Sequence, residues 1–300
     1  MQTNGGHLIK YLRKKNGVSQ AQLAKKLFMS QGMLSNIEKG DAKLSITDFT
    51  AAFAALGVAV QDPWIVHLNE MEFEGYLQYK KIVVLLYCGE TIEKLQMAYY
   101  SFAANPIVKY PSMNQFLSYI SVIINEETED EKKKLAALYA ALRKTEKHFE
   151  DEKITQYRLN FSEGLLVHEI ALTYARLGQP GNAIALLDGI VQNKDSLRTT
   201  DFDNWILLPR IYTDLAVLLM EAAEYERALP ICESALAVIR ESTTLWLSPR
   251  AAYLLGVCYH KLNKPEQEYM PLLAMAYYCA LSFRQNDLAD NIRKEYDVLC

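Results

Sequence analysis

Apolar residues recur at three- and four-residue spacing over most of the chain, which is the period of helices that bury one face. Residues 19–40 show the pattern most clearly, as two short segments separated by a turn. Ser19 and Ser30 stand where N-caps are expected, and Gly40 stands where the second helix ends. The positions expected to face inward are Leu23, Ala24, Leu27, Met33, Leu34 and Ile37. The spacing predicts a helix-turn-helix whose second helix projects outward.

The outward side of the second predicted helix carries short or amide side chains. Gln31 and Asn36 can pair bidentately with adenine, and Ser35 can hydrogen-bond several bases. Gly32 lets the backbone approach closely. Because the first residues of the second helix enter the major groove in this motif, these residue types favour a DNA-binding function.

The stretch from Gly6 to Val58 resembles the Xre/Cro type of DNA-binding domain. The resemblance implies a five-helix domain whose fifth helix runs from Ser45 to Gly57, and it gives Gln20 the role of bracing a phosphate and the recognition helix. The matching residues are Ile9-Lys10-x-Leu12-Arg13, Gly17-x-Ser19-Gln20-x-x-Leu23-Ala24 and Ser30-x-x-x-Leu34-Ser35-x-Ile37-Glu38-x-Gly40. The residues expected to bind DNA are Arg13, Gln20, Ser30, Gln31, Gly32, Ser35, Asn36 and Lys39.

One position departs from this resemblance. The turn of the family usually carries Gly before the hydrophobic residue and Ser, whereas this chain has Phe28-Met29-Ser30. A residue with a side chain at this point either adopts a left-handed conformation at some cost or shifts the turn.

Charge separates the first 60 residues from the rest. They contain eight Lys or Arg residues and three acidic residues, a balance of about +5, and the net charge of −4 leaves about −9 for the remainder. A basic head on an acidic body is typical of a nucleic-acid-binding module. The run Arg13-Lys14-Lys15 is either a set of phosphate contacts or a solvated helix end, and its place beside the helix-turn-helix favours phosphate contacts.

The remaining composition argues against other classes of protein. No apolar run reaches the roughly 18 residues that cross a bilayer, and the polar N-terminus does not fit a signal peptide, so we expect a cytoplasmic protein with no membrane contact. The five cysteines are scattered without metal-ligand spacing, so we expect free thiols and neither a metal nor a cofactor. No phosphate loop or nucleophile elbow is present, and the acidic residues from Glu126 to Glu131 are typical of a solvated loop, so we expect no enzymatic activity.

Past residue 150 the chain contains an internal repeat. Its units begin with Ile170-Ala171-x-x-Tyr174, Leu215-Ala216-x-x-Leu219 and Leu255-Gly256-x-x-Tyr259, and nine residues further on stand Ala183, Ala228 and Glu268. These offsets resemble the tetratricopeptide pattern of paired helices, at about 40 to 45 residues instead of the usual 34. The chain is therefore predicted to be all-α, with a helix-turn-helix domain over 1–60, a linker over 61–70 and a tetratricopeptide-like superhelical domain over 71–300.

Stacked helix pairs form a superhelix whose inner surface suits an extended peptide. Arg210 and Arg250 occupy equivalent repeat positions, where two guanidinium groups can hold a peptide carboxylate or carbonyl. The competing interpretation pairs each Arg with an acidic residue on a neighbouring helix and treats His168 as a polar surface residue. The residues predicted to contact a peptide are His168, Arg176, Arg210, Thr213, Val217, Arg250 and Tyr253.

The two predicted domains together resemble the RRNPP group of Gram-positive quorum-sensing regulators, of the PlcR, Rgg and PrgX kind. This resemblance implies a cytoplasmic homodimer whose repeats bind a short signalling peptide and whose two heads bind an inverted-repeat operator. The aromatic segment from Ala274 to Cys300 either caps the repeats or forms the dimer contact.

The leading hypothesis is a transcription regulator whose peptide ligand alters operator binding or dimer geometry. The alternative is a protein-interaction scaffold with a DNA-tethering head that no peptide regulates. A small reading frame with a secretion signal beside this gene would favour the first.

Overall fold

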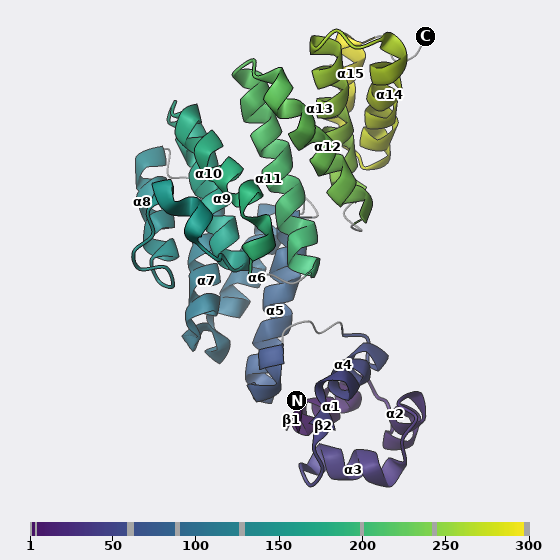
Figure 1. Ribbon diagram of the computed structural model, residues 1–300. Helices are drawn as coiled ribbons and strands as arrows, with labels where there is room; N and C mark the ends of the chain where they lie inside the picture. The colour runs from purple at the N-terminus through teal and green to yellow at the C-terminus, as the bar shows by residue number, and fades with distance from the viewer. Residues whose placement is uncertain are drawn as a thin grey trace. The chain divides into compact units, whose positions relative to one another are not determined.

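The computed structural model describes residues 2–3, 5–58, 63–87, 91–125, 130–198, 201–241 and 245–296. These residues are predominantly helical, which confirms the predicted all-α class (Figure 1). The chain folds as two compact units, Met1–Met113 and Asn114–Cys300, and the division falls within helix α7 (Pro111–Ile124). Within the described ranges, no helix is long and apolar enough to span a membrane.

Four helices and a two-stranded sheet form the head of the first unit. The helices are α1 (Gly6–Lys15), α2 (Gln20–Lys26), α3 (Gln31–Lys39) and α4 (Ile46–Ala55), and strand β1 (Gln2–Thr3) pairs antiparallel with β2 (Leu44–Ser45). Ser19 and Ser30 each accept a hydrogen bond from the amide three residues on, and Gly40 ends α3 with a φ of 86°, as predicted. The core of the head contains Leu8, Ile9, Leu12, Leu23, Leu34, Ile37, Phe49 and Phe53.

Two details of the head differ from the prediction. The segment expected to be a fifth helix is the fourth helix, α4. Residues 41–45, which lie between the end of α3 and the start of α4, form a bend and the strand β2 and not a further helix. Met33 is 50% exposed and does not face inward. Leu34 and Ile37 define the buried face of α3, and Met33 lies about 100° around the helix axis from Leu34.

The rest of the first unit follows the head and contacts it through α5. It contains the 3₁₀ turns η1 (Pro63–His67) and η2 (Pro106–Lys109) and the helices α5 (Glu70–Tyr87) and α6 (Ile92–Ala103). His7 Nε2 lies 2.8 Å from the carbonyl oxygen of Leu68, and both Tyr11 and Lys15 donate to Glu74 Oε1 at 2.6 Å. These hydrogen bonds join α1 to the residues around the start of α5. The predicted linker over residues 61–70 stays a prediction.

The second unit is a series of helix pairs. After α7 come α8 (Glu131–Leu142), η3 (Asp151–Gln156), α9 (Phe161–Arg176), α10 (Pro180–Gln192), η4 (Lys194–Ser196), α11 (Asp201–Glu221), α12 (Tyr225–Glu241), η5 (Leu245–Leu247), α13 (Ser248–Lys261), α14 (Glu266–Ser282) and α15 (Asn286–Glu295). Figure 1 shows α9 with α10, α11 with α12 and α13 with α14 as antiparallel pairs. Because α11 packs on both α9 and α13, the first helices of the pairs lie side by side.

The turns within the pairs confirm the predicted repeat. Gly178, Ala223 and Asn263 occupy equivalent turn positions with φ values of 74°, 58° and 55°. The amide that follows each of them donates back to the repeat residue of the first helix, at 2.9 Å to Tyr174, 2.8 Å to Leu219 and 3.0 Å to Tyr259. The same backbone geometry therefore closes all three units.

Helix α15 caps the last pair. Ala289 and Ile292 pack against Ala276 and Tyr277 in a buried cluster. An apolar strip is left in solvent, where Tyr278, Leu281 and Phe283 are 55%, 45% and 42% exposed. The aromatic segment thus forms the cap, and the predicted dimer contact has this strip as its candidate surface.

Candidate functional site

The polar face of α3 is open to solvent. Gln31, Gly32, Asn36 and Lys39 are exposed, and Ser35 is partly exposed. Ser30 Oγ accepts the amide of Met33 at 3.1 Å, which fixes the first turn of the helix. The structure therefore presents the predicted base-reading residues together on one side, with Leu34 and Ile37 anchoring the other.

A buried ion pair holds α3 in place. Arg13 donates to Glu38 through Nε at 2.6 Å and Nη2 at 2.9 Å, and its Nη1 donates to the Val18 carbonyl at 2.8 Å. Gln20 Nε2 donates to Glu38 Oε2 at 2.8 Å. Burial opposes ionisation of Glu38, but the hydrogen bonds from Arg13 and Gln20 outweigh it and hold the pKa of Glu38 below its usual value.

This geometry revises the role of Arg13. Its side chain is only 10% exposed and is bound to Glu38. Arg13 therefore braces the head, and the predicted contact with a DNA phosphate is wrong. Gln20 makes the bracing contact to α3 that the resemblance implied. Glu38 is the bracing residue that sequence reasoning did not single out, although it stands in the matching motif.

In the second unit, Asp214 on α11 lies between residues of two neighbouring helices. Its Oδ2 lies 2.8 Å from His168 Nε2 on α9, and its Oδ1 lies 3.1 Å from Arg250 Nη2 on α13. Burial opposes its ionisation, but the bond to His168 and the charges of Arg250 and Arg210 lower the pKa of Asp214. The structure thus gives Arg250 an acidic partner on a neighbouring helix, as the competing interpretation expects, and brings buried His168 to the same carboxylate.

The equivalent position one repeat earlier is also acidic. Glu169 lies 45 residues before Asp214, and its Oε1 lies 3.0 Å from Lys134 Nζ and 2.9 Å from Arg176 Nη2. Arg176 Nε also binds Glu131 at 2.9 Å. Arg176 therefore joins α9 to α8 in a separate network, and it lies outside the Asp214 cluster.

Two predicted peptide contacts lie elsewhere. Thr213 is 2% exposed and donates its hydroxyl to the carbonyls of Pro209 and Arg210 in its own helix, because it lies on the buried side of α11. Tyr253 donates to Glu295 Oε2 at 3.0 Å on the capping helix α15. Burial and that bond raise the pKa of Tyr253, and the bond itself joins α13 to the capping helix α15. Val217 is partly exposed on α11.

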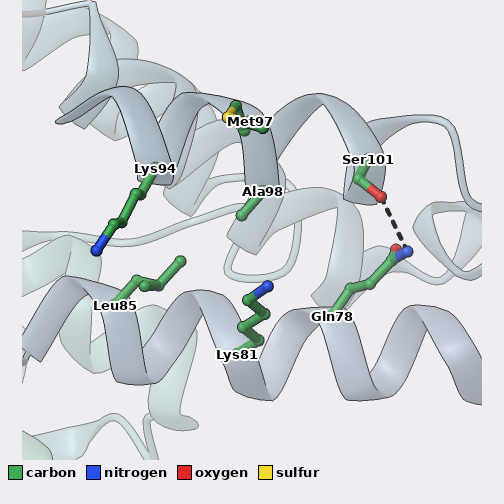
Figure 2. A pocket seen from close by; sticks show the side chains of 7 residues that line it. All are labelled: Gln78, Lys81, Leu85, Lys94, Met97, Ala98 and Ser101. Atoms are coloured by element: carbon green, nitrogen blue, oxygen red, sulfur yellow. Dashed lines mark hydrogen bonds between the residues drawn. The ribbon is translucent and has the colours of Figure 1, made fainter. Parts of the chain in front are cut away.

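The first unit carries a surface pocket of about 350 Å³ between α5 and α6. Figure 2 shows Lys81 on α5 and Lys94 on α6, the two helices that form its opposite walls. At one end Gln78 Nε2 donates to Ser101 Oγ at 3.0 Å. None of the residues that line this pocket was singled out from the sequence.

The capped α2 and α3, their tight turn and the open polar face define a helix-turn-helix head of the DNA-binding type, followed by a tetratricopeptide-like body. A helix-turn-helix family model matches residues 9–62. No curated protein sequence matches the chain.

Solved structures share the fold from end to end. PlcR of Bacillus thuringiensis, in complex with the peptide PapR7 and DNA, is 18% identical with a TM-score of 0.66 and coverage of 97% of this chain and 99% of PlcR. ComR from S. thermophilus, in complex with DNA and its signalling peptide ComS, is 16% identical with a TM-score of 0.57 over 97% and 98% of the two chains. The Streptococcus dysgalactiae SHP pheromone receptor Rgg2 is 12% identical with a TM-score of 0.52 over 99% and 100%. The predicted RRNPP-like architecture is thereby confirmed as a fold.

Proposed function

We propose that the chain is a cytoplasmic transcription regulator that binds an inverted-repeat operator as a homodimer. The supporting observation is the exposed polar face of α3 on a helix that the Arg13–Glu38 pair fixes to the head. Gln31 and Asn36 lie where amides can pair with adenine, and Lys39 lies where a cation can meet a phosphate. PlcR and ComR, which share this fold, were both crystallised with DNA.

Selection of binding sequences from a random duplex library by the full-length chain tests this function. Gln31→Ala or Asn36→Ala should weaken binding by about 1–3 kcal/mol and relax preference at one base pair in each half-site. Asn182→Ala, which removes an exposed amide of α10 in the second unit, is the matched amide control and should bind as the parent does. Selected sequences that share no motif would contradict the proposal.

The same regulator, we propose, binds a short signalling peptide on the layer formed by α9, α11 and α13. Arg250 is 49% exposed, and its bond to Asp214 uses one of the five N–H donors of a guanidinium, so its side chain can also bond a ligand. A peptide carboxylate placed here would share Arg250 and Arg210 with Asp214. PlcR and ComR were crystallised with the peptides PapR7 and ComS.

A ligand alters operator binding only through its different affinities for two conformations of the body. Exchange of partners around Asp214 provides such a difference, because the carboxylate links three successive first helices. Couplings of this kind are typically about 1–3 kcal/mol, which is a 5- to 150-fold change in operator affinity.

The peptide site is tested with the double variant Arg210→Ala/Arg250→Ala. The probes are synthetic peptides that copy the C-terminal residues of small secreted reading frames beside the gene. The variant should keep operator binding and lose the peptide response. Arg227→Ala, which breaks the ion pairs of an α12 arginine with Asp188 and Glu224, should keep both. Loss of helical circular dichroism in the double variant would favour a purely structural role. Capture of a folded protein and no peptide would favour the scaffold alternative.

A further inference from the structure

The turn between α2 and α3 holds a bulky side chain in a conformation that suits glycine. Phe28 has a φ of 53°, and the amide of Met29, the next residue, donates to the Ala24 carbonyl at 3.0 Å. In this left-handed conformation a Cβ crowds the following carbonyl, so a non-glycine residue destabilises the turn.

Backbone hydrogen bonds close the turn, but no apolar packing from the described residues of the head offsets the strain at Phe28. Phe28 is 99% exposed, so its ring packs on none of the residues that the structure describes. The other described non-glycine residues with positive φ are Ala223, Asn263 and Arg284, which are small or polar. Phe28 is therefore the one large apolar side chain in this conformation among the described residues. Strained residues that gain nothing in the folded state concentrate where a protein meets its ligand.

The position of Phe28 identifies the ligand chemistry. It lies three residues before Gln31, the first residue of α3, and helices of this type insert that end into the major groove. The exposed Lys25 and Lys26 precede it, so the surroundings of the ring suit a polyanion. The apolar group that the major groove presents is the 5-methyl group of thymine, against which Phe side chains pack.

We propose that Phe28 packs on the 5-methyl group of a thymine in each operator half-site and so extends base reading beyond the polar residues of α3. This assignment rests on the proposed DNA binding. Phe28, which replaces the usual glycine of this turn, would then contribute to sequence specificity by apolar contact with thymine. This contribution is independent of the hydrogen bonds that Gln31 and Asn36 make to bases.

Replacement of thymine by deoxyuridine tests the contact, because it removes only the methyl group. Operators selected by the full-length chain are resynthesised with one deoxyuridine per half-site, and affinity is measured by fluorescence anisotropy at fixed salt. At one thymine position the wild-type chain should lose about fourfold per half-site, the value of one buried methyl group. Phe28→Gly, which fits the turn, should bind thymine and deoxyuridine operators equally.

Met33→Ala is the matched control, since Met33 is the other exposed apolar residue beside Gln31 and Gly32. It should keep the wild-type sensitivity to deoxyuridine. The inference is overturned if no thymine position shows the loss, if Phe28→Gly keeps it, or if Met33→Ala alone abolishes it. Failure to bind any selected duplex would instead overturn the proposed function.

Discussion

An Arg13→Met variant should loosen α3, because it removes the partner of a buried carboxylate. Glu38 is 4% exposed and receives hydrogen bonds of 2.6 and 2.9 Å from Arg13 and one of 2.8 Å from Gln20. Methionine keeps the apolar stem of the arginine but leaves Glu38 with the amide alone. Breaking one side of a buried ion pair costs about 3–5 kcal/mol, so most of the stability of a small head would be lost.

Hydrogen exchange of the full-length chain measures this effect locally, at the α3 amides. Exchange there should accelerate at least about a hundredfold in Arg13→Met, whereas amides of the second unit should be unchanged. Arg13→Met/Glu38→Leu removes both charges and should recover most of the protection. A loss below about 1 kcal/mol in the single variant, or no recovery in the double variant, would refute the assignment of this pair as the brace of α3.

Three further predictions follow from local geometry. The pKa of Glu38 is lowered in the folded head, so ionised Glu38 contributes to the free energy of unfolding. That contribution is complete above the unfolded-state pKa near 4.3 and is lost as the pH falls through the lower folded value. Urea denaturation from pH 7 to 3 should therefore show the loss only below about pH 4. Gly6→Ala would place a Cβ 1.8 Å from the Ile37 carbonyl oxygen and should destabilise the head by about 3 kcal/mol, which a thermal melt detects; an unchanged melting temperature would contradict the packing of α1 on α3. Tyr278→Lys/Leu281→Lys should convert a dimer to a monomer in analytical ultracentrifugation, and a persistent dimer would place the contact elsewhere.

The features that the sequence predicted well are those that depend on neighbouring residues. Ser19 and Ser30 act as caps because a hydroxyl there reaches an amide three residues on, whatever the rest of the chain does. The helix pairs that turn at Ala223 and Asn263 were predicted from the repeat spacing of Leu215-Ala216-x-x-Leu219 and Leu255-Gly256-x-x-Tyr259. Such local signals are sufficient for the fold class and for the exposed face of α3.

The features that it missed depend on partners far along the chain. Arg13 was predicted to contact a phosphate because its position in a basic run suggests an exposed side chain. Its partner Glu38 lies 25 residues further along the chain, and only the fold shows that this partner allows the charge to be buried. Asp214 was missed because its role appears only when α9, α11 and α13 lie side by side, which brings His168 and Arg250 to it. Apolar periodicity therefore predicts the helices, whereas the partners of each side chain depend on how those helices pack.

The measurement that tests the central claim most directly is operator affinity with and without the synthetic peptides, for the full-length chain and for Arg210→Ala/Arg250→Ala. Fluorescence anisotropy should show a 5- to 150-fold change in affinity for the wild-type chain and none for the variant, with equal affinities in the absence of peptide. Peptide binding that leaves operator affinity and dimer geometry unchanged, or a response that survives in the variant, would contradict the claim that the Asp214 cluster links the ligand to the head.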